Sequence, residues 1–157
     1  MGDHEIVIRS VRKNPEEWKT FSDYIASRWT DEEGKRLYDD CIYHSLNARF
    51  PLPEWFLAVK GEKIVGCVGL ITNDFISRMD LMPWMCALYV EEDERGKGIA
   101  GRLIAAAGEY ARLNGFHKMY LATDHTSFYE RYGGVYIGDG VHPWKETSRI
   151  YMMETEK

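Results

Sequence analysis

Short apolar runs punctuate this chain at intervals that predict β-strands. Apolar and polar residues alternate over residues 5–11, and apolar runs follow at 55–59, 63–71, 84–90 and 118–122. Each run is bounded by turn-forming or charged residues, as strands usually are. Two late runs, 135–137 and 149–153, predict further strands. We expect the run at 84–90 to lie centrally in a sheet, because it carries few charges.

Helical patterns lie between these runs. Residues 18–29 place large apolar side chains every three to four positions, and Asn14 and Pro15 before them are typical of a helix start. Residues 30–33, Thr-Asp-Glu-Glu, predict a capping box for a second helix that reaches about residue 47. Two more helices are expected, one over 98–113 and a short one over 125–132.

This order of strands and helices predicts an α/β (α+β) fold in a single domain spanning residues 1–157. We expect a mixed central sheet of about six to seven strands flanked by four helices. The chain has 157 residues, of which 45% are hydrophobic and 29% charged, the ordinary balance of a soluble domain.

Charge and hydropathy exclude several partners. The net charge of −5 gives no electrostatic support for binding nucleic acid. No apolar run approaches the roughly 20 residues of a membrane helix, so no membrane partner is expected. The N-terminus lacks a basic region followed by an apolar run, which indicates that it is not a signal peptide. We expect a cytoplasmic protein.

The cysteine pattern is also that expected of a cytoplasmic protein. Cys41, Cys67 and Cys86 are an odd number with no close pair, which argues against a disulfide framework and against a zinc knuckle. We expect no metal site.

Residues 95–101 carry the clearest chemical signal. They form a glycine-rich turn between the apolar run at 84–90 and the predicted helix. The first N–H groups of a helix lack intrahelical partners, and with Arg95 and Lys97 they suit phosphate oxygens. The string at 96–101 also satisfies the dinucleotide pattern Gly-x-Gly-x-x-Gly, but the acid expected about 20 residues later is missing. A glycine-rich helix start that binds no ligand is the remaining alternative.

The string Arg-x-x-Gly-x-Ala at 95–100 resembles the coenzyme A pyrophosphate loop of the GNAT superfamily of N-acetyltransferases. Residues 128–133, Phe-Tyr-Glu-Arg-Tyr-Gly, are similar to a second signature of that superfamily. The order of predicted elements matches the GNAT fold along nearly the whole chain. Gly134 departs from the pattern, since an aromatic residue usually follows the glycine.

The resemblance implies roles for individual residues. The Leu88 N–H would stabilise the oxyanion that develops on the thioester, where the strand splays from its neighbour. Tyr129 would protonate the leaving thiolate. Coenzyme A would be held by the strand and the loop, through Leu88, Tyr89, Val90, Arg95, Gly96, Lys97, Gly98, Ile99, Ala100 and Gly101.

The sequence does not identify the general base that would deprotonate the amine. Some superfamily members carry a glutamate four residues before the oxyanion-hole residue, but Trp84 occupies that position here. The candidates are Asp80, Glu91, His44 and His125.

The acceptor side is defined only in outline. The early helices and the loop over 74–83 would line it, with Trp29, Trp55 and Trp84 as candidates for its wall. Four acidic residues could attract a cationic amine: Asp39, Asp40, Asp74 and Asp80.

The implied activity is an acetyl-CoA-dependent N-acetyltransferase that acts on a primary amine of a small molecule by direct acyl transfer. Two alternatives stay open: a peptide or protein N-acetyltransferase, and a non-catalytic module that binds acyl-CoA. A homodimer is a reasonable expectation.

Overall fold

The computed structural model describes residues 5–156. Within them, seven strands form one mixed sheet. The strands are β1 (Ile6–Ser10), β2 (Glu54–Lys60), β3 (Lys63–Ile71), β4 (Trp84–Val90), β5 (Lys118–Thr123), β6 (Val135–Val141) and β7 (Thr147–Glu154). The helices are α1 (Trp18–Trp29), α2 (Lys35–Ser45) and α3 (Ile99–Leu113), with 3₁₀ turns η1 (Pro15–Glu17), η2 (Glu92–Glu94) and η3 (Tyr129–Tyr132).

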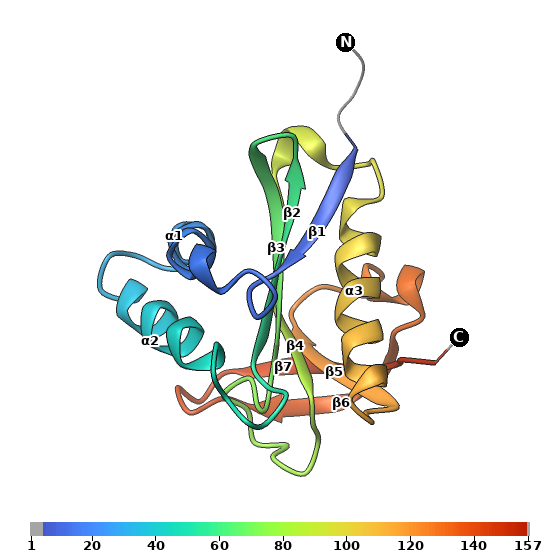
Figure 1. Cartoon of the computed structure of the whole chain (residues 1–157). Helices are drawn as coiled ribbons and strands as arrows, with labels where there is room; N and C mark the ends of the chain where they lie inside the picture. Colours follow the sequence, from blue (N-terminus) through green and yellow to red (C-terminus); the bar gives the residue numbers. More distant parts are fainter. Residues whose placement is uncertain (1–4, 157) are drawn as a thin grey trace.

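The strands lie in the order β1-β2-β3-β4-β5-β7-β6, so β4 is central as expected. All neighbouring strands are antiparallel except β4 and β5, which are parallel. Helices α1 and α2 cover one face of the sheet and α3 covers the other (Figure 1). The mixed α/β fold predicted from the sequence is therefore confirmed.

Each face of the sheet carries its own core. On the α3 face, the buried stripe of Ile99, Leu103 and Ala107 packs against β2, β3, β4, β5 and β7. On the other face, Phe21 and Ile25 of α1 pack against β2 and β3. Burying large apolar side chains contributes about 1.5–3 kcal/mol each, and these two layers fix the position of β4 between them.

Three details of the helices differ from expectation. Three α-helices are described rather than four, because 125–132 forms only the 3₁₀ turn η3. The predicted capping box over 30–33 is also wrong. Asp31 accepts the Gly34 N–H at 2.9 Å, and α2 begins at Lys35 and ends at Ser45. Asn14 does not cap a helix either, since its side chain binds Arg9 and the Ser10 carbonyl instead.

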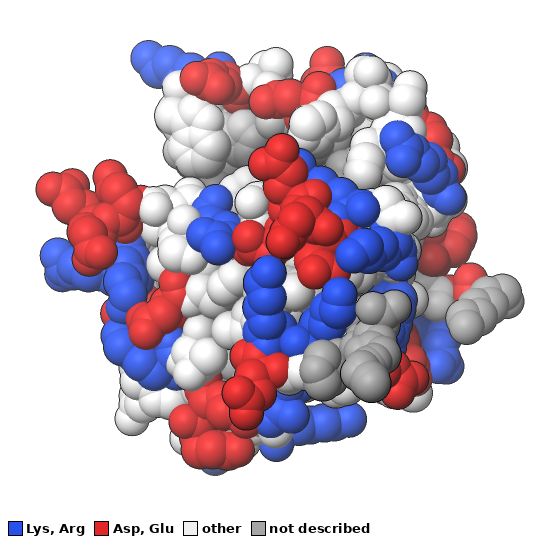
Figure 2. All heavy atoms as spheres, turned by 90° about the horizontal axis from the view of Figure 1, so that it is seen from above, with Lys and Arg blue, Asp and Glu red and all other residues white. Residues whose placement is uncertain are grey.

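None of the helices described over residues 5–156 combines the length and apolarity needed to cross a membrane. On the face seen in Figure 2, acidic and basic side chains are interspersed, and neither sign covers it alone.

Candidate active site

The central strand β4 is irregular where the site lies. It pairs with β5 at one position, Trp84 with Tyr120, and the strands then separate. On its other edge, the register with β3 shifts between Cys67 and Gly69, so that two β4 residues face one β3 residue. Ala87 within this bulge has φ of 54°. The splay implied by the resemblance is confirmed, and it leaves the β5-facing edge of β4 open around Leu88.

The glycine-rich loop adopts the conformation that its glycines permit. Gly96 and Gly98 have φ of 80° and 82°, in the left-handed region where a side chain is strained. The first α3 bond runs from the Arg102 N–H to the Gly98 carbonyl at 3.2 Å. The preceding N–H groups of the helix therefore have no partners in its ladder. The space beside both glycines is open, which suits a phosphate group.

The two basic residues of the loop are held by neighbours. Arg95 donates from Nε to the Val90 carbonyl at 2.9 Å, and its guanidinium lies 5.5 Å from the centre of the Tyr89 ring. Lys97 pairs with Glu94 at 3.3 Å. Arg95 is therefore fixed at the end of β4, beside the open helix start.

Two hollows meet at Leu88 and Tyr129. One, the donor groove, has a volume of about 560 Å³ and runs from Leu88 and Tyr89 along the glycine-rich loop. The other, the acceptor cavity, has a volume of about 700 Å³ and extends from Leu88 toward α1, α2 and the β3–β4 loop. Trp29 and His125 also line both hollows. The two residues predicted as catalytic therefore share one junction.

Tyr129 is held in η3 by aromatic packing. Its ring centre lies 4.8 Å from that of Phe128 and 6.1 Å from that of Tyr151. Burial raises the pKa of Tyr129 to about 12, so the phenol is protonated at neutral pH. Gly134 donates its N–H to the Tyr129 carbonyl at 2.9 Å, and a side chain at Gly134 would collide with that carbonyl. This contact explains why glycine replaces the usual aromatic residue.

Of the four candidate bases, His125 alone lies at the junction. Asp80 is exposed and pairs with Arg78 at 2.9 Å, and it lines neither hollow. His44 is exposed on α2 beside Asp40.

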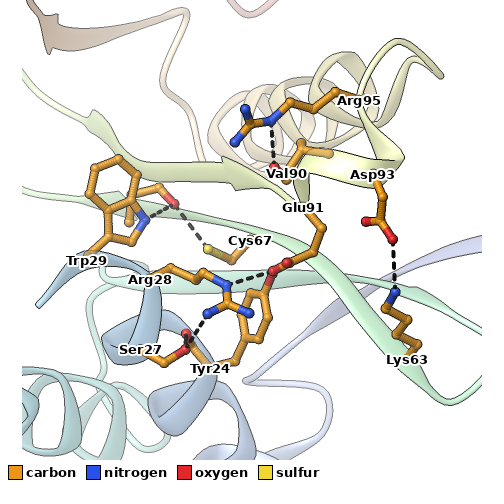
Figure 3. Close-up of polar contacts among 11 residues, drawn as sticks. Tyr24, Ser27, Arg28, Trp29, Lys63, Cys67, Val90, Glu91, Asp93 and Arg95 are labelled. Atoms are coloured by element: carbon orange, nitrogen blue, oxygen red, sulfur yellow. Dashed lines mark hydrogen bonds and ion pairs between the residues drawn. The ribbon is translucent and has the colours of Figure 1, made fainter.

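Glu91 is engaged by two partners from α1. It accepts from Tyr24 and, at 2.7 Å, from Arg28 (Figure 3). Burial raises the pKa of Glu91, but these two bonds outweigh that effect and lower it. Glu91 thus anchors α1 to the end of β4.

Asp74 is set apart from the other acids by its burial in the acceptor cavity, which the sequence does not predict. It is half-buried and lines the acceptor cavity. Burial raises its pKa to about 6, against an opposing effect of His142. The sequence marked Asp74 only as one of four acids that could attract an amine, and burial by residues distant in the chain separates it from the others.

The two remaining acids that could attract an amine, Asp39 and Asp40, lie outside the lining of the acceptor cavity. Asp39 accepts from Ser22 at 2.5 Å and pairs with Lys35 at 3.1 Å; the Ser22 bond is the largest cause of a pKa lowered to about 2. Asp40 is exposed, and neither residue lines the acceptor cavity.

The structure places two of the three predicted tryptophans in the wall of the acceptor cavity. Trp29 and Trp55 line the acceptor cavity, together with Tyr38 and Phe75. Trp84 does not: it is fully buried and donates its indole N–H to the Leu81 carbonyl at 2.7 Å. Its role is to fill the space where β4 and β5 meet.

Comparisons with known proteins find solved structures of the same fold. The chain is similar to an aminoglycoside 6'-acetyltransferase type Ii, with 22% identity, a TM-score of 0.70, and coverage of 96% of this chain and 98% of that one. It is also similar to a GNAT family N-acetyltransferase from Escherichia coli in complex with CoA, with 17% identity, a TM-score of 0.71, and coverage of 99% and 84%.

A third structure is a spermidine N-acetyltransferase chimera from Vibrio cholerae and hSSAT. It shares 17% identity and a TM-score of 0.67, with coverage of 96% of this chain and 95% of that one. No curated protein sequence matches significantly. The model of the acetyltransferase (GNAT) family, however, matches residues 15–134, which include the central strand, the glycine-rich loop and Tyr129. The chain belongs to the acetyltransferase (GNAT) family and is an acyltransferase.

Proposed function

We propose that this acetyltransferase is an acetyl-CoA-dependent enzyme that acetylates a primary amine of a small molecule, within one domain over residues 1–157. The observation that carries the proposal is the junction of the donor groove and the acceptor cavity at Leu88 and Tyr129. A thioester in the groove and an amine in the cavity would meet there without any covalent enzyme intermediate.

On the donor side, the open edge of β4 would pair with the amide groups of the pantetheine arm, as a sheet edge pairs with an added strand. The helix start and Arg95 would bind the pyrophosphate. The residues assigned to coenzyme A are Leu88, Tyr89, Val90, Arg95, Gly96, Lys97, Gly98, Ile99, Ala100 and Gly101.

In the transfer step, the neutral amine attacks the thioester carbonyl carbon. The N–C bond forms, the carbonyl oxygen becomes negative, and the Leu88 N–H donates to it. The C–S bond then breaks, and Tyr129 gives its proton to the thiolate. The ammonium substrate loses two protons overall: one leaves to solvent before attack, and the other restores Tyr129 as the amide forms.

The acceptor class is supported by the fold relatives, among which are aminoglycoside and spermidine acetyltransferases. The three cysteines of the described chain are free thiols, which supports a reducing, cytoplasmic location.

The test is release of the coenzyme A thiol from acetyl-CoA with a panel of primary amines and amine-bearing peptides. Turnover with small amines is the expected result. Turnover only with peptides would favour the protein acetyltransferase, and coenzyme A binding without any turnover would favour the binding module.

A further inference from the structure

The wall of the acceptor cavity is mainly apolar and aromatic. Besides Tyr129 at the junction, its large aromatic side chains are Trp29, Tyr38, Trp55 and Phe75, and most of the other lining residues are aliphatic or sulfur-containing. No Lys or Arg among residues 5–156 lines it. A carboxylate or phosphate on the acceptor would therefore find no Lys or Arg side chain to balance its charge, and His125 lies where the cavity meets the donor groove.

Negative charge in the cavity is also sparse. Asp74 and Asp124 are its two acids, and Asp124 is exposed beside His125. Asp74 is half-buried, and within the described part of the chain it has no hydrogen bond or ion pair. The nearby His142 binds the Phe75 carbonyl and the Ser148 hydroxyl, each at 2.8 Å, through its two ring nitrogens. The Asp74 carboxylate is thus left for a ligand.

We propose that the acceptor is an amine with one positive charge and an aromatic or aliphatic body, which enters as an ammonium ion bound by Asp74 and becomes the neutral nucleophile when one proton leaves. The proposal rests on the proposed function and names its acceptor class. The volume of about 700 Å³ is within the usual range for small-molecule sites, and aromatic walls favour a flat apolar body. A polycation would leave all but one or two of its charges against apolar walls, which is unfavourable.

Matched pairs of amines test the class. Phenethylamine and phenylalanine differ by a carboxylate, and pentylamine and cadaverine differ by a second ammonium group. We expect the singly charged member of each pair to have the higher kcat/KM by roughly 10-fold or more. Spermidine or kanamycin turned over faster than phenethylamine would overturn the class alone, whereas no turnover with any amine would overturn the proposed function with it.

Asp74→Asn tests the ammonium site. The expected result is a KM for phenethylamine raised roughly 10- to 100-fold, with the KM for acetyl-CoA unchanged. Asp80→Asn is the matched control, because Asp80 lies on the same loop, is exposed and lines neither hollow. An unchanged amine KM in Asp74→Asn, or an equal rise in both variants, would overturn the assignment.

A second, independent observation concerns Trp29. Its indole N–H donates to the Ala87 carbonyl at 3.0 Å, and the Cys67 thiol also donates to that oxygen, at 3.2 Å (Figure 3). The Ala87 carbonyl and the Leu88 N–H belong to one planar trans peptide and point in opposite directions. Holding the carbonyl therefore fixes the direction in which the Leu88 N–H points.

We infer that Trp29 is a positioning residue for the oxyanion donor. The bulge places Ala87 at φ of 54°, a conformation that alanine adopts only when its surroundings hold it. A hydrogen bond to the carbonyl also polarises the peptide and strengthens its N–H as a donor. Trp29, at the end of helix α1, thus connects the wall of the acceptor cavity to strand β4.

Trp29→Phe tests this role, because it removes the N–H and keeps an aromatic ring. We expect kcat to fall roughly 10-fold while both KM values stay within about twofold. The melting temperature should change little, since Trp29 is 49% exposed.

Arg28→Gln is the control, because it removes the neighbouring contact with Glu91 without touching the Ala87 carbonyl. It should keep the kcat of the original enzyme. An unchanged kcat in Trp29→Phe, or the same loss of kcat in Arg28→Gln, would contradict the positioning role.

Discussion

Burial raises the pKa of two side chains in the acceptor cavity. Desolvation raises the pKa of Tyr129 to about 12, which keeps the proton that an acid must give. Desolvation also raises the pKa of Asp74 to about 6, which leaves its carboxylate ionised at neutral pH. Desolvation therefore favours the proton on Tyr129 and weakens, without removing at neutral pH, the negative charge on Asp74.

Tyr129→Phe should lower kcat by roughly 10²–10⁴, because it removes the hydroxyl that would protonate the thiolate and keeps the ring packing. The KM for acetyl-CoA and the melting temperature should change little. Steady-state kinetics with a thiol reagent measures this, with Tyr136→Phe as a control on the exposed strand β6. A variant that keeps most of its turnover would return Tyr129 to a packing role.

Asp74→Asn should change stability with a definite dependence on pH. Because the native pKa of Asp74 lies above its unfolded value, the native state binds this proton more tightly, and stability falls as pH rises from about 4 through 6. The variant avoids this loss. Urea unfolding should therefore show it about 2 kcal/mol more stable than the original chain at pH 8 and equally stable at pH 4. Equal stabilities at both pH values would contradict this environment for Asp74.

At the scale of elements, the proposed binding of coenzyme A depends on the junction of β4, the glycine-rich loop and α3. Gly98→Glu should abolish the rise in melting temperature caused by coenzyme A, because a carboxylate would occupy and repel the phosphate position.

Gly115→Glu is its matched control. Gly115 ends α3 at φ of 90° with open space beside it, so the backbone strain is similar, but the site lies at the opposite end of the helix. Coenzyme A should still stabilise that variant. Equal responses of the two variants to coenzyme A would contradict the loop as its site.

The same elements show what the sequence could predict. Strand β4 and helix α3 were predicted nearly to the residue, because their apolar periodicity is local and strong. The start of α2 at Lys35 could not be predicted in this way. Asp31 accepts the Gly34 N–H and forms a turn before the helix, and the Thr30 side chain occupies the space beside Gly34. Turn η3 stays short because Gly133 ends it at φ of 87°.

The acceptor side could not be predicted from local pattern. The burial around Asp74 comes from contacts between the β3–β4 loop and the C-terminal strands. The Ser77 N–H, for example, donates to the Val141 carbonyl at 2.8 Å, and Ile76 packs with Ile150. These residues are far apart in the sequence, so nothing near Asp74 distinguishes it from Asp80.

At the scale of the whole molecule, the splayed sheet joins two layers of helices into one site. In the proposed site, the α3 side would supply the helix start that binds the pyrophosphate, and the α1–α2 side would supply the acceptor wall (Figure 1). Coenzyme A at about 100 times its dissociation constant should raise the free energy of unfolding by about 2.7 kcal/mol. No shift in melting temperature at millimolar coenzyme A would contradict the donor site.

The central claim is that acetyl-CoA and a small amine react at the junction of the two hollows. The most direct measurement follows thiol release and the N-acetyl product together, by absorbance and mass spectrometry, with acetyl-CoA and phenethylamine. The account predicts one N-acetylphenethylamine for each thiol released, and loss of both signals in Gly98→Glu. Thiol release without an acetylated amine, or no release with any primary amine, would contradict it.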